Sequence, residues 1–221
     1  MSATIYNFEQ AQTSSHPFPE FIFIDTSFLL SSLGPVPEAV KDFPSHTNVQ
    51  CSNFLDFLKS KAKNGDICLL TSDGVIEEFL HVILKRCVNS KDLSNPVFKA
   101  HKEQYMRVER NPVTELLKDH PELIKKHYPI LDEYYKRILE VPIAALGADY
   151  LGGLNTNAGI SDHMCDLINK YQILSGDAHH ISIGLLAGIK HFIAIDCDFH
   201  RVDDITVYTC LSPKPHKCKV C

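Results

Sequence analysis

Short, unbroken runs of apolar residues mark the strands that the sequence predicts. Residues 21–24 and 67–70 are such runs, and residues 191–195 form another after an opening histidine. Residues 205–208, which include one threonine, predict a fourth strand. A run that is apolar at every position is typical of a strand buried on both faces, as in a parallel sheet covered by helices. The first three runs end abruptly in polar residues, so each of these predicted strands has a sharp carboxyl end.

Segments with helical spacing separate these runs. Apolar residues recur every three or four positions over residues 53–63, 76–87, 161–170 and 178–186, and Ser72 or Asp73 is placed to cap the second of these helices. The segment from residue 28 through residue 37 has the composition of a loop. Strands that alternate with helices predict an α/β fold, with three α/β/α layers around a central parallel sheet. We assign residues 1–210 to this one domain.

The middle of the chain departs from this pattern. From about residue 95 to 145 the sequence is rich in Lys, Glu, His and Tyr and is interrupted by five prolines. The pattern predicts several short helices, and the apolar residues are too few for an independent core, so we interpret the segment as a helical insert. Its basic and tyrosine side chains suit phosphates and stacked bases of RNA, but its many acids make a solvated helical surface an equal alternative.

Acidic residues gather at the ends of the predicted strands. They either follow a strand directly or lie in the first turns of a neighbouring helix, and they are Asp25, Glu77, Glu78, Asp177, Asp196 and Asp198. Ligands of open α/β sheets bind outside the carboxyl ends of the strands, so we expect these acids to converge. Converging carboxylates need a cation, and oxygen ligands favour Mg²⁺ or Mn²⁺. Taken singly, each acid also fits a helix cap, a turn or a solvated helix position.

Three stretches that contain these acids resemble the motifs of PIN-domain ribonucleases. Residues 21–30 resemble the opening strand and its Asp-Thr/Ser motif, and residues 71–83 resemble the second motif. Residues 175–202 are similar to the third and fourth motifs, through Asp-Ala-x-His, then Ala-Gly, then Asp-x-Asp-Phe. The resemblance covers about residues 20–86 and 160–210 and leaves the middle third of the chain unexplained.

The resemblance implies a metal-dependent endoribonuclease that prefers single-stranded RNA. Mg²⁺ or Mn²⁺ would activate a water molecule for attack on phosphorus. The implied catalytic residues and metal ligands are Asp25, Glu78, Asp177 and Asp196, with Asp198 as a further metal ligand. Glu78 fits the family pattern better than Glu77. The implied substrate contacts are Thr26, Ser27, His180 and His200.

The resemblance also bears on partners and on an alternative function. Members of the family include toxins of toxin–antitoxin pairs, so a homodimer and an inhibitory protein partner are expectations beside the RNA substrate. The length and the insert fit a small toxin poorly. The alternative function is a non-catalytic PIN-type RNA-binding or scaffold protein, which keeps the acids without holding a metal productively.

Charge and composition change this picture little. The 221 residues contain 22 Lys and Arg against 27 Asp and Glu, which excludes a protein held to nucleic acid by bulk positive charge. Without the five acids assigned to the metal site, acids and bases are equal in number.

Residues 1–19 lack the pattern of a signal peptide, and no apolar run approaches the length that spans a bilayer. The eight cysteines show no disulfide pattern, so we predict a cytoplasmic protein with reduced thiols and no membrane partner.

The tail formed by residues 211–221 is rich in Cys, His and Lys. Together with the residue before it, the tail offers four ligands for tetrahedral Zn²⁺, namely Cys210, His216, Cys218 and Cys221. The spacing provides only half of a zinc ribbon. A basic tail with free thiols is therefore the alternative.

Overall fold

All strands of the sheet run parallel, in the order β1-β6-β5-β2-β3-β4. The computed structural model describes residues 3–13, 17–33, 45–92, 98, 111–147 and 157–211, and the structural statements below concern these residues. The strands are β1 (Thr4–Asn7), β2 (Phe21–Ile24), β3 (Cys68–Ser72), β4 (Ile143–Leu146), β5 (His191–Ile193) and β6 (Thr206–Thr209). The four predicted strands correspond to β2, β3, β5 and β6.

The two edge strands were not predicted. β1 pairs with β6, and β4 pairs with β3. Both are only partly buried. β1 begins and ends in a polar residue, and β4, although apolar throughout, is half alanine, a residue depleted in strands. β4 also lies within the last residues of the predicted insert, which means that the chain has already returned to the sheet there.

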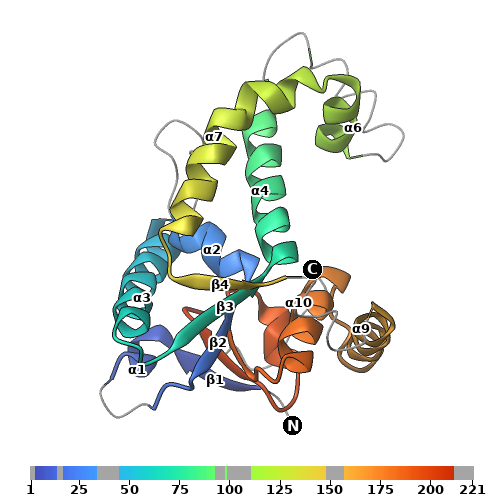
Figure 1. The fold of residues 1–221 in the computed structure, drawn as a ribbon. Coiled ribbons are helices and arrows are strands. Elements are labelled where there is room, and N and C mark those ends of the chain that lie inside the picture. Colours follow the sequence, from blue (N-terminus) through green and yellow to red (C-terminus); the bar gives the residue numbers. More distant parts are fainter. Residues whose placement is uncertain are drawn as a thin grey trace.

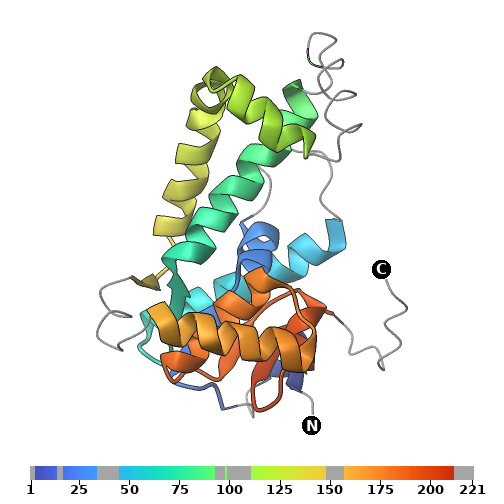
Figure 2. The same cartoon turned by 90° about the vertical axis from the view of Figure 1, so that its right-hand side faces the viewer.

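Helices cover both faces of the sheet, which confirms the three-layer α/β fold (Figures 1 and 2). One layer contains α1 (Phe8–Ala11), α2 (Thr26–Ser32) and α3 (Ser45–Lys63), and the other contains α9 (Asn157–Tyr171) and α10 (Ser175–Leu186). The prediction of a loop over residues 28–37 was wrong for residues 28–32, which belong to α2. The Asp25 side chain accepts a hydrogen bond from the Ser27 N–H, and this N-cap starts α2.

α10 packs very closely against β5. A Cβ atom on Gly184 would lie 2.6 Å from Cε1 of Phe192, so this position needs a glycine for the approach. Phe192 in turn contacts Phe23 of β2, with ring centroids 5.6 Å apart. Most of α10 is buried on both of its sides, and this burial fixes the residues at its amino end relative to the sheet.

A helical arm projects from the β3–β4 edge of the sheet (Figures 1 and 2). It comprises α4 (Asp73–Cys87), the π-helix η1 (Val88–Asp92), α6 (Pro112–Asp119) and α7 (Glu122–Leu139). The tip of the arm has a small apolar core of its own, formed by Leu84, Val88, Val113, Leu116, Leu117 and Leu123. The prediction of several short helices without a core was therefore wrong in part: the described part of the insert has the short helix α6 and the long helix α7, and it contributes to this small core.

A buried polar network links two helices of the arm. The carboxylate of Asp92 contacts Nζ of Lys126 and Nε2 of His127. Asp92 and His127 are both buried. Burial raises the pKa of Asp92, but the hydrogen bonds from Lys126 and His127 outweigh it and leave the pKa below its ordinary value.

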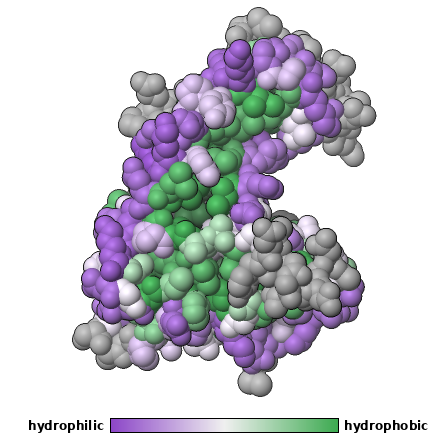
Figure 3. Space-filling model, in the orientation of Figure 1, coloured by the Kyte–Doolittle hydropathy of each residue, from purple (hydrophilic) through white to green (hydrophobic). Residues whose placement is uncertain are grey.

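One side of α7 exposes apolar and aromatic side chains. Ile124, Tyr128, Tyr135 and Leu139 are all exposed and lie on one stripe of the helix. Figure 3 shows hydrophobic surface that continues from the arm onto the body of the molecule. No helix within the described ranges has the length and apolar character needed to cross a bilayer.

Candidate active site

The acidic residues meet where the direction of the sheet connections reverses. From β2 the chain continues to β3 and β4 on one side, whereas β5 and β6 lie on the other side of β2. Ile24 and Ile193 are paired at the ends of β2 and β5, and the Asp25 N–H donates to the Ile193 carbonyl at 3.0 Å. Ligand crevices form at such switch points in parallel sheets.

Both carboxylate oxygens of Asp25 have polar contacts within the site. Oδ2 accepts hydrogen bonds from the Ser27 N–H at 3.0 Å and from the Ser27 hydroxyl at 2.6 Å. Oδ1 lies 2.9 Å from Nδ1 of His180. The Ser27 hydroxyl also accepts from the Ile195 N–H at 3.0 Å, which ties the start of α2 to the segment after β5. These contacts fix the orientation of Asp25, which is only 2 % exposed.

Glu78 reaches the same place from α4. The Thr26 hydroxyl donates to Glu78 Oε2 at 2.6 Å, and His180 Nε2 lies 3.6 Å from that oxygen. The Glu78 side chain is 46 % exposed, whereas that of His180 is 5 % exposed, so Glu78 is the member of the pair that solvent reaches. A Cβ atom on Gly176 would lie 3.9 Å from Glu78 Oε1, which places the start of α10 beside this carboxylate.

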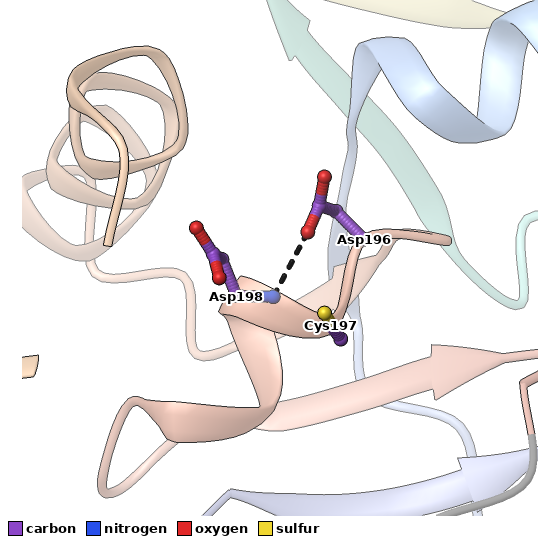
Figure 4. A group of neighbouring side chains, drawn as sticks. All are labelled: Asp196, Cys197 and Asp198. Atoms are coloured by element: carbon purple, nitrogen blue, oxygen red, sulfur yellow. Dashed lines mark hydrogen bonds between the residues drawn. The ribbon is translucent and has the colours of Figure 1, made fainter. Parts of the chain in front are cut away.

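Asp196 and Asp198 lie on the turn after β5. Asp196 caps the short 3₁₀ helix η2 (Cys197–Arg201) and accepts from the Asp198 N–H at 2.9 Å. Asp198 accepts from the Leu174 N–H at 3.2 Å. Figure 4 shows both carboxylates projecting from the same side of the turn. Among the described residues, Asp196, Cys197 and Asp198 form the one group of three or more potential metal ligands whose ligand atoms all lie within 4.8 Å of one another. The other predicted ligands, Asp25, Glu78 and Asp177, are not part of that group.

Asp177, in the first turn of α10, lies in the field of the other acids. Its pKa is raised to about 7, first by burial and then by the negative charges of Asp196, Asp25 and Asp198. The charge of His180 opposes this rise. These interactions connect α10, β2 and the turn after β5. We call Asp25, Glu78, Asp177, Asp196 and Asp198 the acidic cluster.

His180 supplies positive charge at the centre of the acidic cluster. Burial lowers its pKa, but the hydrogen bond to Asp25 and the charges of Asp25, Glu78 and Asp177 outweigh burial and raise it. A protonated imidazole thus balances part of the negative charge when no other cation is near.

The acidic cluster still has excess negative charge. Among the described residues, Asp177 is about half protonated at neutral pH because its pKa is about 7, and the other four carboxylates lie with two cations. These cations are His180 and Arg201, whose Nη1 lies 3.4 Å from Asp198 Oδ1. Burial and the charges of Asp196 and Asp198 raise the pKa of Cys197, which keeps its sulfur as a neutral thiol. The remaining donors are carboxylate oxygens, and this donor set fits Mg²⁺ or Mn²⁺.

The structure also places the other predicted site residues. Thr26, Ser27 and His180 contact acids of the cluster, and His200 is buried on η2. Glu77 is exposed beside Glu78. Within the predicted zinc set, Cys210 has its sulfur 3.9 Å from Cys51 Sγ, and the other three ligands, His216, Cys218 and Cys221, lie outside the described residues.

Sequence reasoning assigned Thr26 and Ser27 to the substrate, and it missed their hydrogen bonds to the acids. The one signal for these hydrogen bonds was the Asp-Thr-Ser sequence. That signal is ambiguous, because a hydroxyl next to a strand-end acid also suits an N-cap or a turn. The Cys51–Cys210 contact had no sequence signal, since 159 positions separate the two cysteines.

The chain has no match in three comparisons with known proteins. No protein-family model matches it, and searches of curated proteins and of solved structures gave no match either. The arrangement of the acidic cluster at the sheet switch point is therefore the main basis for a functional conclusion.

Proposed function

We propose that this chain is a metal-dependent endoribonuclease of the PIN type, which hydrolyses phosphodiester bonds of single-stranded RNA. The observation that supports the proposal is that His180 lies between Asp25 and Glu78 at the sheet switch point, beside the turn after β5 that carries Asp196 and Asp198. Such a group of acids has a high electrostatic cost unless a cation binds. The motif resemblance supplies the reaction class and RNA as the substrate.

Each residue of the site has a role in this proposal. Asp25, Glu78, Asp177 and Asp196 would hold Mg²⁺ or Mn²⁺, with Asp198 beside them. Such an ion supplies a nucleophilic hydroxide and stabilises the leaving oxygen. Thr26 and Ser27 orient the carboxylates of Glu78 and Asp25 through their hydroxyl groups.

His180 is a positioning residue in the same proposal. Its imidazole bridges Asp25 and Glu78, so it keeps two acids from opposite sides of the site at a fixed separation. Its positive charge lowers the repulsion between them before a metal binds.

A second candidate function is a non-catalytic RNA-binding or scaffold protein. The same His180 contacts favour it, because an imidazolium between Asp25 and Glu78 satisfies both carboxylates without a metal. Calorimetric titration with Mn²⁺ and Mg²⁺ separates the candidates. Binding that depends on Asp196 supports the nuclease, and no heat of binding at millimolar concentrations supports the scaffold.

Cleavage of a labelled single-stranded RNA tests the nuclease directly. We expect cleavage with Mn²⁺ or Mg²⁺, slower cleavage of the same strand in a duplex, and none in chelator. The double variant Asp25→Asn/Asp196→Asn should lose the activity, whereas Asp56→Asn, which removes an exposed acid of α3, should retain it. Cleavage that persists in chelator or in the double variant overturns the proposal.

The same proposal extends to location and partners. A cytoplasmic nuclease would meet RNA in a reducing compartment, and the six cysteines within the described residues are free thiols. The homodimer, the inhibitory protein partner and the zinc tail stay predictions.

A further inference from the structure

A cavity of about 310 Å³ opens on the helical arm, where α4 ends and α6 begins. Its walls include two cations, two carboxamides and apolar side chains, namely Lys85, Arg86, Asn89, Asn111, Val82 and Val113. None of the described residues that line it is acidic. Its chemistry is therefore opposite in charge to that of the acidic cluster.

The cavity lies on the same helix face as Glu78. Val82, Lys85 and Asn89 follow Glu78 at intervals of four, three and four residues, and this spacing keeps them in one row along α4 and η1. The seven residues from Glu78 to Lys85 correspond to about 11 Å along the helix axis. In Figure 1, α4 rises from the end of β3 toward α6, so this row connects the acidic cluster with the cavity.

The charge along this row changes from negative to positive. His81 lies between the two ends, and burial lowers its pKa, as does the charge of Lys85, while Glu78 acts in the opposite direction. No ion pair joins Lys85 to a carboxylate within the part of the chain that the structure describes. Lys85 is half-buried and lines the cavity.

Asn111 adds a directed donor to the cavity. Its Oδ1 accepts from the N–H groups of Val113 and Thr114 at 3.1 and 3.2 Å, as the N-cap of α6. Because the oxygen is occupied in this way, the Nδ2 group remains for a ligand. The positive end of the α6 dipole lies at the same place and favours negative charge.

We propose that this cavity binds a backbone phosphate of the RNA strand whose scissile bond lies at the acidic cluster. This inference rests on the proposed function, because it takes RNA as the substrate of that site. Contacts from Lys85, Arg86, Asn89 and Asn111 to phosphate oxygens would fix the register of the strand without reading its sequence.

Binding of a labelled twelve-nucleotide RNA, measured by fluorescence anisotropy in chelator, tests this proposal without any need for cleavage. Two variants change the charge of the cavity at accessible positions, Lys85→Gln and the nearly isosteric Asn89→Asp. Each should weaken binding about fivefold, as expected for one ion pair near a surface. The salt dependence of binding should fall by about 0.7 in log–log slope for Lys85→Gln.

Matched controls are Lys63→Gln and Asn64→Asp, which make the same charge changes at the far end of α3. They should bind RNA like the wild type. Cleavage of the twelve-nucleotide RNA should slow in Lys85→Gln and keep the wild-type rate in Lys63→Gln.

The outcomes separate this inference from the proposed function. If the cavity variants weaken RNA binding but the wild type cleaves no RNA, the phosphate site stands and the nuclease does not. If the wild type cleaves RNA and the cavity variants bind it like the controls, or if the wild type binds no RNA, the phosphate site is overturned. Tight binding of inorganic phosphate that depends on Lys85, with RNA affinity unchanged in the variant, would instead assign the cavity to a small phosphate ligand.

Discussion

Nδ1 of His180 lies 2.9 Å from Oδ1 of Asp25, although 155 positions separate the two residues in the chain. Both side chains are buried. The contact joins the amino-terminal part of α10 to the end of β2. The other ring nitrogen of His180 lies close to Glu78 of α4. One imidazole therefore links three of the segments that form the acidic cluster.

Replacing this imidazole should destabilise the chain when no metal is present. In His180→Asn, Asp25 is buried without its charged partner, and we expect a loss of about 3 kcal/mol, typical of breaking a buried pair. Thermal unfolding in chelator measures this loss. Mn²⁺ should recover part of it, because the ion supplies the missing positive charge.

The neighbouring His179→Asn is the control for that experiment. His179 is half-buried and lies near Gly74 and Ser72 rather than between the two acids. We expect a smaller loss there and no greater response to Mn²⁺ than in the wild type. Equal losses in the two variants would contradict a special role for His180.

A divalent ion should stabilise the wild-type chain against heat. A ligand that binds only the folded state adds about 2.7 kcal/mol at a concentration one hundred times its Kd. The expected result is a rise in Tm with Mn²⁺ or Mg²⁺ at constant ionic strength, and little rise in Asp196→Asn. An equal rise in the variant would show that the ions bind elsewhere.

The buried contacts of Asp92 in the arm should stabilise the folded chain at neutral pH. In Asp92→Asn, the Lys126 and His127 side chains lose their carboxylate partner, and we expect a loss of about 3 kcal/mol. Asp132→Asn is the matched control, because its pair with Lys136 lies on the exposed side of the same helix. A surface pair of this kind contributes about 0.5 kcal/mol or less.

The pH dependence of Asp92 follows from the direction of its pKa shift. The pKa in the folded state is below the ordinary value of 3.8, so the folded state favours the carboxylate more than the unfolded state does. Its stabilising contribution is therefore present above about pH 4 and is lost as the pH falls through the lower, folded-state pKa. Unfolding measured from pH 6 to pH 2 should show a shallower loss in Asp92→Asn than in the wild type; parallel curves would contradict the prediction.

Oxidation should join Cys51 to Cys210. Their sulfur atoms lie 3.9 Å apart, and small side-chain rotations bring two such sulfurs to bonding distance. Diamide would take up the two thiol hydrogens as the disulfide forms, so peptide mapping should find one linked pair and the loss of two hydrogens. The long loop that this bond closes should raise the Tm.

Two variants and one ion make this oxidation experiment specific. Cys51→Ser should abolish the crosslink, and replacing the exposed Cys165 by serine should leave it. If the tail holds Zn²⁺ through Cys210, added Zn²⁺ should protect that thiol from diamide. Rapid crosslinking that Zn²⁺ does not slow would count against Cys210 as a zinc ligand.

Central strands were predictable and edge strands were not, for a physical reason. Residues 21–24 and 191–195 are apolar at nearly every position because both faces of a central strand are covered, and this burial is visible in the sequence. β1 and β4 are partly exposed, so their sequences carry a weak signal. Their strand conformation depends on pairing with β6 and β3, which are distant in the chain.

The sequence by itself determined that acids follow the central strands, because a strand end is a local feature of the pattern. It also carried the parallel α/β class, through the alternation of buried runs and helices. Only the tertiary structure decided that His180 bridges Asp25 and Glu78, that Thr26 holds Glu78, and that Glu78 rather than Glu77 lies in the cluster. These relationships depend on how α10, α4 and β2 pack together, and contacts between residues so far apart in the chain leave no local pattern that a single sequence can show.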